Sequence, residues 1–466
     1  MSLDTSKFNG RIKDEMSKLT SSMPQLTTNI SNLVAAICIP LLIIINLVLF
    51  YINILTPHLL TVELFMILLI IFMIIAINYT SMYTSSPESV TRLLSVRNQA
   101  LGLSIDRISA SPEPVCLKLS NKSAPYNHAS ITDSNIALLN WSPLTVRLAG
   151  YLGGDASVTN GVFDMANGIK YAIKLGARSF VFDIDYLDVA PCEPLLIHRD
   201  AQGNKASLNT GSIREGMEVL NDKAFMPSNN NDPVIIVLYL NRVPPGTTQR
   251  SSFFNAIAKS MNPISANHLG LSQDGNFHNC ASESMLFTGD ITNYQKKFIV
   301  LCNYDTTLLT RAPNPKDNLN FWVNARLWKN ANSSKNIGSV TTSAPTGTTA
   351  YATVGSTTDF LSLSNEAKTT VLNSTVTTYT IALGPVEEIL TKGTETSPGQ
   401  LDILITGLGI HSVPMDVIRL GESPNYTATL KNKKLNPLFA DIIRPSSEKD
   451  QLSYWTYADY YRFNHA

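Results

Sequence analysis

Two near-continuous apolar runs dominate the first part of the chain. The first spans residues 33–54 and the second about residues 59–79, and Glu63 is the one formally charged side chain across residues 19–87. A helix rises about 1.5 Å per residue, so each run is long enough to cross a hydrocarbon core of about 30 Å. The pattern predicts a transmembrane helical hairpin over residues 33–79.

A hairpin buried in a soluble core is the alternative, although core helices seldom run this long without a polar stripe. A cleaved signal peptide fits less well, because the first run starts late, is long and has a second run behind it. The link at residues 53–58 is short, which makes the two helices antiparallel. Lysines and arginines precede the first helix and follow the second, and the link has none. The positive-inside rule then predicts a two-span membrane protein with both termini on the cytoplasmic side.

Beyond the hairpin, apolar strands alternate with amphipathic segments. A polar segment, 1–32, precedes the hairpin, a tether or irregular layer spans 80–140, and a globular domain fills 141–466. The strand candidates are 145–149, 179–187, 194–198, 233–240, 297–302, 379–383, 401–405 and 413–417, and the helix candidates are 164–175, 212–220 and 253–261. Strands alternating with helices predict an α/β fold with a parallel sheet, and this many repeats favours a closed TIM-like (β/α) barrel over an open sheet.

Residues 336–378 break this rhythm, because they are rich in Ser, Thr, Gly and Ala. We expect a long insertion, either a solvated loop or a small β excursion. Its role is open between a plain surface insertion and a binding loop.

Composition excludes several classes of protein. The 466 residues carry a formal net charge of zero, so nothing predicts nucleic acid as a partner. The five cysteines are scattered and lack CxxC spacing, which argues against a disulfide framework and against zinc, and agrees with a reducing compartment.

Polar side chains gather where four consecutive predicted strands end. They are Asp183 and Asp185 with Asp188 just beyond, then His198, Arg199 and Asp200, then Asn241 and Arg242, and finally Asn303 and Asp305. Asp183 and Asp185 alternate by two and therefore share a face of their strand. Two carboxylates on one face are candidate ligands for Ca²⁺, and His198 is a candidate acid or base. The alternatives are carboxylates that bond loop amides and a histidine that is simply packed.

The order of motifs along the domain resembles a known family. Segments 144–150, 175–185, 231–240, 409–416 and 438–445 follow one another as in the barrel of phosphatidylinositol-specific phospholipase C. The resemblance covers about residues 143–447. In detail the chain is most similar to the phospholipase-C-like barrel proteins of large DNA viruses.

The resemblance implies a reaction with two histidines, one as base and one as acid, and a cation, Ca²⁺ or Arg, at the phosphate. The first histidine belongs to a turn after the first strand, where this chain has residues 150–156 and no histidine. Asp155 matches the family's aspartate there, which leaves Gly154 at the position of the base. His198 matches the second histidine, Asp183 matches the family's acidic position at the strand end, and Asp185 lies where some members place an Arg.

A positioned proton-transfer group contributes typically about 10² to 10⁴ in rate, so the missing histidine argues against catalysis. We therefore expect a membrane-anchored structural protein of a large DNA virus particle, a minor capsid protein at its internal membrane, with an inactive phospholipase-C-like barrel as scaffold. Its partners would be the lipid bilayer and other capsid proteins, with no cofactor. The alternative is a membrane-tethered phosphatidylinositol-type phospholipase C, a phosphoric diester hydrolase that would need Ca²⁺, or a binder of phosphoinositide headgroups.

Overall fold

The computed structural model describes the globular domain in segments. These are residues 136–152, 161–174, 177–199, 203–226, 231–270, 280–309, 313–333, 340–384 and 403–414, with positions between 90 and 99, residue 400, and the pairs 442–443 and 455–456. All belong to one compact unit. The predicted segment 1–32, the hairpin 33–79 and Asp155 lie outside the described residues. Within the described segments, no helix is long and apolar enough to cross a bilayer.

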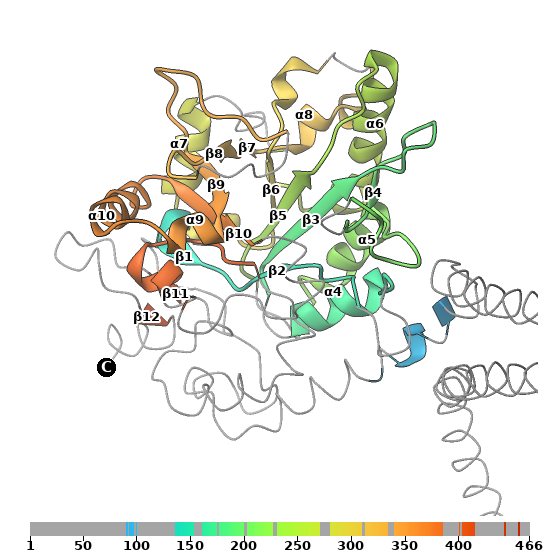
Figure 1. The fold of residues 1–466 in the computed structure, drawn as a ribbon, viewed down its shortest axis with the longest axis horizontal. Helices are drawn as coiled ribbons and strands as arrows, with labels where there is room; N and C mark the ends of the chain where they lie inside the picture. The colour runs from blue at the N-terminus through green and yellow to red at the C-terminus, as the bar shows by residue number, and fades with distance from the viewer. Residues whose placement is uncertain are drawn as a thin grey trace, which may run out of the picture. The chain divides into compact units, whose positions relative to one another are not determined.

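The strands form a mainly parallel array (Figure 1). In spatial order they are β2 (Thr145–Arg147), β3 (Ser179–Asp185), β5 (Val234–Leu240), β6 (Phe298–Cys302) and β7 (Ala325–Arg326), followed by β8 (Trp328–Lys329), β9 (Ala352–Ser356) and β10 (Tyr379–Leu383). Only Leu327 separates β7 from β8, so one extended segment pairs with β6 at its start and with β9 at its end. The short strand β4 (Leu195–Leu196) lies antiparallel to β3.

The last strand in this order is connected back to the first strand through Ser412. Ile381 in β10 forms a parallel bridge with Ser412. The Oγ1 atom of Thr145 in β2 donates a hydrogen bond to the Oγ atom of Ser412, with the two oxygens 3.0 Å apart. The predicted parallel α/β architecture is confirmed, and the strands close on themselves as in a TIM-like barrel.

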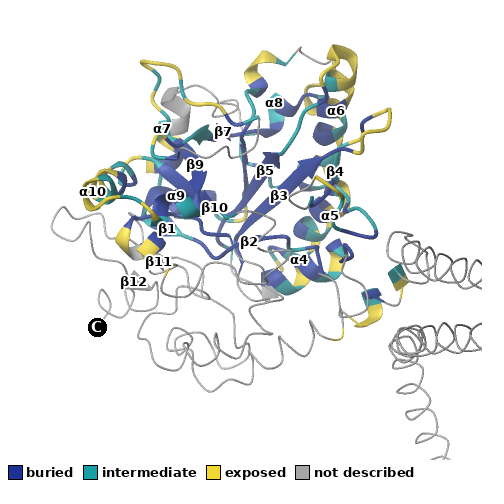
Figure 2. Cartoon of the chain, in the orientation of Figure 1, coloured by how far each residue is buried: buried dark blue, intermediate teal, exposed yellow. Residues whose placement is uncertain are grey.

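Alternation along the strands produces two cores. One set of side chains fills the barrel, and its strand members include Val181, Ile235, Val237, Ile299, Leu301, Ala325, Val354 and Ile381. The intervening side chains face the helices and include Phe180, Phe182, Ile184, Ile236, Leu238, Val300 and Cys302. Figure 2 shows the long strands β3 and β5 buried along their length, with exposed positions on the helices and loops around them. Successive side chains of a strand point to opposite faces of the sheet, and both faces of this sheet are covered. Apolar residues therefore follow one another without a break, which explains the continuous apolar runs in the sequence.

Helices follow the strands around the barrel. They are α4 (Met165–Lys174), α5 (Ile213–Lys223), α6 (Thr247–Ser260), α7 (Cys280–Thr288), α8 (Leu319–Trp322), α9 (Thr357–Leu361) and α10 (Asn365–Ser374). Short 3₁₀ turns are η2 (Leu138–Asn140), η3 (Asn262–Ile264), η4 (Ile291–Tyr294), η5 (Thr306–Leu308) and η6 (Pro315–Asp317). Ser212 caps α5 by accepting a hydrogen bond from the backbone N–H of Glu215, which satisfies one of the free donors at the start of the helix.

The amino-terminal end of the barrel is covered by η2 and α7. Phe287 in α7 stacks on Tyr379 with ring centroids 5.5 Å apart, and His411 stacks on the same ring at 4.8 Å. The Nδ1 atom of His411 accepts a hydrogen bond from the Thr380 N–H, so its Nε2–H donates to the carbonyl oxygen of Leu139. Beside this end, β1 (Trp141–Ser142) pairs with β11 (Ile442–Ile443), which pairs with β12 (Trp455–Thr456).

The structure corrects three boundaries. Residues 352–374, inside the predicted insertion 336–378, supply β9, α9 and α10 to the barrel, because Ala352 and Val354 face the core despite the Ser/Thr-rich composition around them. The predicted strand 401–405 is instead a π-helical turn, Ile403–Gly407, since a short apolar run fits a buried helix as well as a strand. Residues 136–140, assigned to the tether 80–140, already pack in the core.

Candidate functional site at the mouth of the barrel

The carboxyl ends of β2, β3 and β5 bring charged side chains to the mouth of the barrel. Asp183 and Asp185 lie on the same face of β3 as Val181, which packs in the barrel interior, so the predicted shared face is confirmed. Arg147 lies on the neighbouring strand β2. Inward-facing polar groups at strand ends are where a β/α barrel places its chemistry.

Arg147 and Asp183 form a buried ion pair. The Arg147 Nε atom lies 2.8 Å from Oδ2 of Asp183, and its Nη2 atom lies 2.5 Å from Oδ1. A third bond runs from Nη1 to the carbonyl oxygen of Gly384, at 2.7 Å. The two side chains are 3% and 0% exposed. Burial by itself raises the pKa of Asp183, but the charge and hydrogen bonds of Arg147 outweigh it and hold that pKa below its ordinary value.

Two uncharged side chains, those of Tyr239 in β5 and Asn303 directly after β6, are also buried at this end of the strands. The guanidinium carbon of Arg147 lies 5.9 Å from the ring centroid of Tyr239. Burial raises the pKa of Tyr239, so its phenol stays protonated. The side chain of Asn303 accepts a hydrogen bond from the Leu240 N–H at 2.8 Å and donates to the Leu240 carbonyl at 3.0 Å. Asn303 therefore joins the ends of β5 and β6, which is a structural role.

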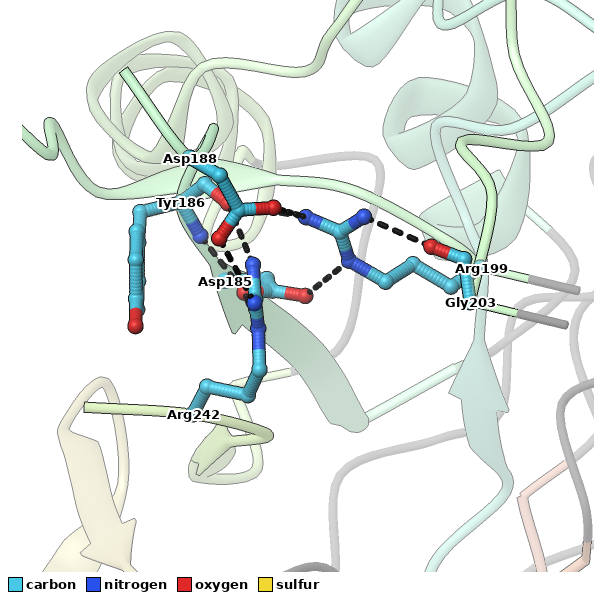
Figure 3. Close-up of polar contacts among 6 residues, drawn as sticks. All are labelled: Asp185, Tyr186, Asp188, Arg199, Gly203 and Arg242. Atoms are coloured by element: carbon cyan, nitrogen blue, oxygen red, sulfur yellow. Dashed lines mark hydrogen bonds and ion pairs between the residues drawn. The ribbon is translucent and has the colours of Figure 1, made fainter. Parts of the chain in front are cut away.

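Asp185 is held by two other arginines (Figure 3). Its Oδ2 atom accepts from Nε of Arg199 at 2.7 Å, and its Oδ1 atom accepts from Nε of Arg242 at 2.8 Å. Oδ1 also accepts from the backbone N–H of Tyr186 at 2.7 Å. The Asp185 side chain is 2% exposed, so both of its oxygens are engaged inside the protein.

These contacts test the predicted Ca²⁺ site. Calcium takes about six to eight oxygen ligands from carboxylates, carbonyls and water. Here Asp183 faces one guanidinium and Asp185 faces two, so a bound cation would lie against positive charge. In the described part of the chain, no group of three or more His, Cys, Asp or Glu residues is arranged to hold a metal ion. The described residues do not fit Ca²⁺ at Asp183 and Asp185.

His198 lies in an aromatic pocket. Its ring stacks on Phe163 with centroids 5.1 Å apart and meets the Tyr151 ring edge-on at 5.2 Å. The side chain is buried, and among the described residues neither ring nitrogen has a hydrogen-bond partner. A cavity of about 20 Å³, room for about one water molecule, is lined by both His198 and Asp183.

The electrostatics of the pocket keep this imidazole neutral. Burial lowers the pKa of His198 to about 4, with Asp183 raising it and Arg147 lowering it further. At pH 7 roughly one molecule in a thousand carries the imidazolium. An imidazole has to be protonated before it can donate a proton to a leaving oxygen. The neutral ring is suited instead to accepting a proton or a hydrogen bond.

The sequence reasoning missed the partners of the carboxylates. Arg199 and Arg242 were predicted only as polar residues at strand ends, and none of Arg147, Arg199 and Arg242 was paired with an aspartate. One signal was present: Arg147 sits at an inward position of a buried strand, where a charged group needs a buried counter-ion. The carboxylate of Asp183 on the next strand is the group that meets this need.

Comparisons with known proteins identify similar folds but no family. No protein-family model matches the chain, and no curated protein is significantly similar in sequence. Similar solved structures include PLC21 of S. officinalis, at 12% identity, TM-score 0.41, and coverage of 62% of this chain and 34% of that one. The chain thus spans about a third of that protein. A calcium-dependent phosphoinositol-specific phospholipase C of Pseudomonas sp. matches at 10% identity and TM-score 0.39, with 66% and 99% of the two chains covered.

A Ca²⁺-dependent phosphatidylinositol-specific phospholipase C of Streptomyces antibioticus matches at 9% identity and TM-score 0.37, covering 62% of this chain and 96% of that one. The Pseudomonas and Streptomyces proteins among these similar structures are therefore calcium-dependent phospholipases C specific for inositol lipids. Identities and TM-scores this low carry no argument about the function of the chain, which has to rest on its own geometry.

Proposed function

We propose that the protein is a membrane-anchored structural protein whose phospholipase-C-like barrel is a scaffold without catalytic activity. The observation that carries this proposal is the ion pair between Arg147 and Asp183. It occupies the position where the resemblance to the family expects a carboxylate available for a cation. Asp185 is neutralised in the same way by Arg199 and Arg242.

The anchoring part of the proposal comes from the sequence. The two apolar runs of residues 33–79 would tether the barrel to a lipid bilayer, with both chain ends on the cytoplasmic side. The setting we propose is the internal membrane of a large DNA virus particle, where the barrel would contact capsid proteins. This setting rests on the sequence resemblance alone.

Two experiments test the proposal. Carbonate extraction and protease protection of the expressed chain should show an integral membrane protein with its barrel on the cytoplasmic side. Mass spectrometry of purified particles should find the protein at the copy number of a structural component. A chain released by carbonate would contradict the tether, and absence from particles would contradict the structural role.

His198 favours a second candidate, a phospholipase or headgroup-binding protein. Its two ring nitrogens have no partner among the described residues, and it borders a cavity beside Asp183. In this alternative the neutral imidazole would accept a proton or a hydrogen bond from a lipid headgroup. Release of inositol phosphate from phosphatidylinositol vesicles, lost in His198→Ala, would favour this candidate over the scaffold.

A further inference from the structure

Arg199 and Arg242 come from different loops and converge on a second carboxylate, that of Asp188 (Figure 3). The Nη1 atom of Arg242 lies 2.8 Å from Oδ1 of Asp188, and the Nη2 atom of Arg199 lies 3.6 Å from its Oδ2. The carboxylate of Asp188 thus contacts two guanidinium groups, and it is more exposed than the buried carboxylate of Asp185.

The two guanidinium groups are fixed without help from Asp188. Each donates its Nε–H to Asp185 and an Nη2–H to the carbonyl oxygen of Tyr186. Arg199 also donates to the carbonyl of Gly203, and the guanidinium of Arg242 lies 4.4 Å from the ring centroid of Tyr186. If Asp188 moved away, both groups would keep their positions and still point outward.

Asp188 is the exposed member of this cluster. Its side chain is 64% exposed, compared with 2% for Asp185, 21% for Arg199 and 34% for Arg242. Its loop neighbours Leu187 and Val189 are also exposed. The hydrogen bond from Arg242 lowers the pKa of Asp188, so the group that closes the cluster is an anion. An ion pair with an exposed carboxylate contributes little to stability, so another anion can displace the carboxylate of Asp188.

We propose that Arg199 and Arg242 form a binding site for a phosphate group, and that Asp188 occupies this site as an internal competitor when no ligand is bound. The N–H groups of a guanidinium donate to phosphate oxygens as they do to carboxylate oxygens, and a phosphate dianion carries more charge than one carboxylate.

This site does not depend on catalysis, because its residues are distinct from His198 and the Arg147–Asp183 pair. Whether the barrel is a scaffold or an enzyme, this site would hold a phosphate group at one edge of the barrel mouth. The phosphate could come from a lipid headgroup or from a free phosphate ion. Both share the chemistry that the arginines recognise, and the experiment has to separate them.

The test is calorimetric titration of inorganic phosphate into the full chain, held in phosphatidylcholine nanodiscs at constant ionic strength. We expect measurable binding that tightens in Asp188→Ala, by about tenfold if Asp188 occupies the site nine-tenths of the time. Binding should be lost in the double variant Arg199→Gln with Arg242→Gln. The matched controls are Asp222→Ala and Arg214→Gln, which change an exposed carboxylate and an exposed guanidinium on α5; they should bind as the wild type does.

Adding phosphatidic acid to the nanodiscs separates the two sources. Weaker binding of soluble phosphate in such discs indicates that a lipid phosphate reaches the site, and unchanged binding indicates a site for free phosphate. An Asp188→Ala variant that binds phosphate no better than the wild type would overturn the proposal. So would a double arginine variant that keeps its thermal unfolding midpoint and still binds phosphate.

Discussion

Arg147 on β2 and Asp183 on β3 are joined by two hydrogen bonds, of 2.8 and 2.5 Å, that engage both oxygens of the carboxylate. The pair lies at the mouth of the barrel with almost no exposed surface. A charge in such a place is tolerated because its counter-ion is beside it. The pair therefore fixes the charge state of the mouth and joins two neighbouring strands.

Arg147→Met should destabilise the protein strongly. It leaves Asp183 as an uncompensated buried charge, which costs about 3–5 kcal/mol, whereas replacing both members of such a pair by apolar residues is often close to neutral. The double variant with Asp183→Leu should therefore recover most of the loss. Urea unfolding measures these free energies, with Arg214→Met as an exposed control. Equal losses in the single and double variants would contradict this account.

Acid should weaken the fold below about pH 6.5. Burial lowers the pKa of both His198 and His268 to about 4, compared with 6.5 in the unfolded chain. The unfolded state then binds more protons, so stability falls as the pH drops from about 6.5 towards 4, by about 2 kcal/mol for each histidine at pH 5. Asp183, whose pKa is lowered, adds a further loss in stronger acid.

Unfolding free energies measured between pH 7.5 and pH 4.5 test this dependence. His198→Leu should make the slope shallower, because one of the buried histidines no longer takes up a proton on unfolding. A stability that stays constant across this range, or a variant with an unchanged slope, would show that the imidazoles are not buried as neutral groups.

Calcium should not stabilise the protein through Asp183 and Asp185. Both carboxylates are engaged by guanidinium groups, so a divalent cation has no free charge to bind there. The midpoint of thermal unfolding should be the same in millimolar Ca²⁺ and in EDTA. A Ca²⁺-dependent increase that disappears in Asp185→Asn would contradict the arrangement of the mouth described above.

Gly168 on α4 should not tolerate a side chain. A Cβ atom there would collide with the carbonyl oxygen of Ala149, at the turn after β2 that borders the His198 cavity. Because the obstacle is backbone, relief requires the helix to move, and we expect a loss of at least about 1–3 kcal/mol for Gly168→Ala. Gly407→Ala is the control, since its new atom would meet only Ile403 at 3.9 Å. Equal stability of the two variants would refute this packing.

The strand order was predictable where the sequence is apolar and regular. The runs at β3, β5 and β6 are buried on both faces, so they are continuous in sequence and their strands lie where the pattern places them. The pattern failed at β9, whose Ala, Thr, Val, Gly and Ser residues are of low hydrophobicity. Small side chains fit the interior there, so this buried strand does not stand out as an apolar run in the sequence.

The sequence predicted which carboxylates lie at the site, but it did not predict which arginines pair with them. Alternation placed Asp183 and Asp185 on one face, but it could not say whether a cation or an arginine neutralises them. That choice depends on Arg147, 36 residues earlier in the chain, and on Arg242, 57 residues after Asp185. The fold brings these residues together, and no local pattern encodes their contact.

The most direct test of the central claim is turnover of phosphatidylinositol by the full chain. The assay follows release of inositol phosphate from vesicles between pH 5 and pH 8, in Ca²⁺ and in EDTA, with His198→Ala in parallel. We predict no release above that of the His198→Ala variant in either condition, because the imidazole is neutral and the carboxylates of the mouth are bound by arginines. Release that is lost in His198→Ala, in Ca²⁺ or in EDTA, would contradict the account of the barrel as a scaffold.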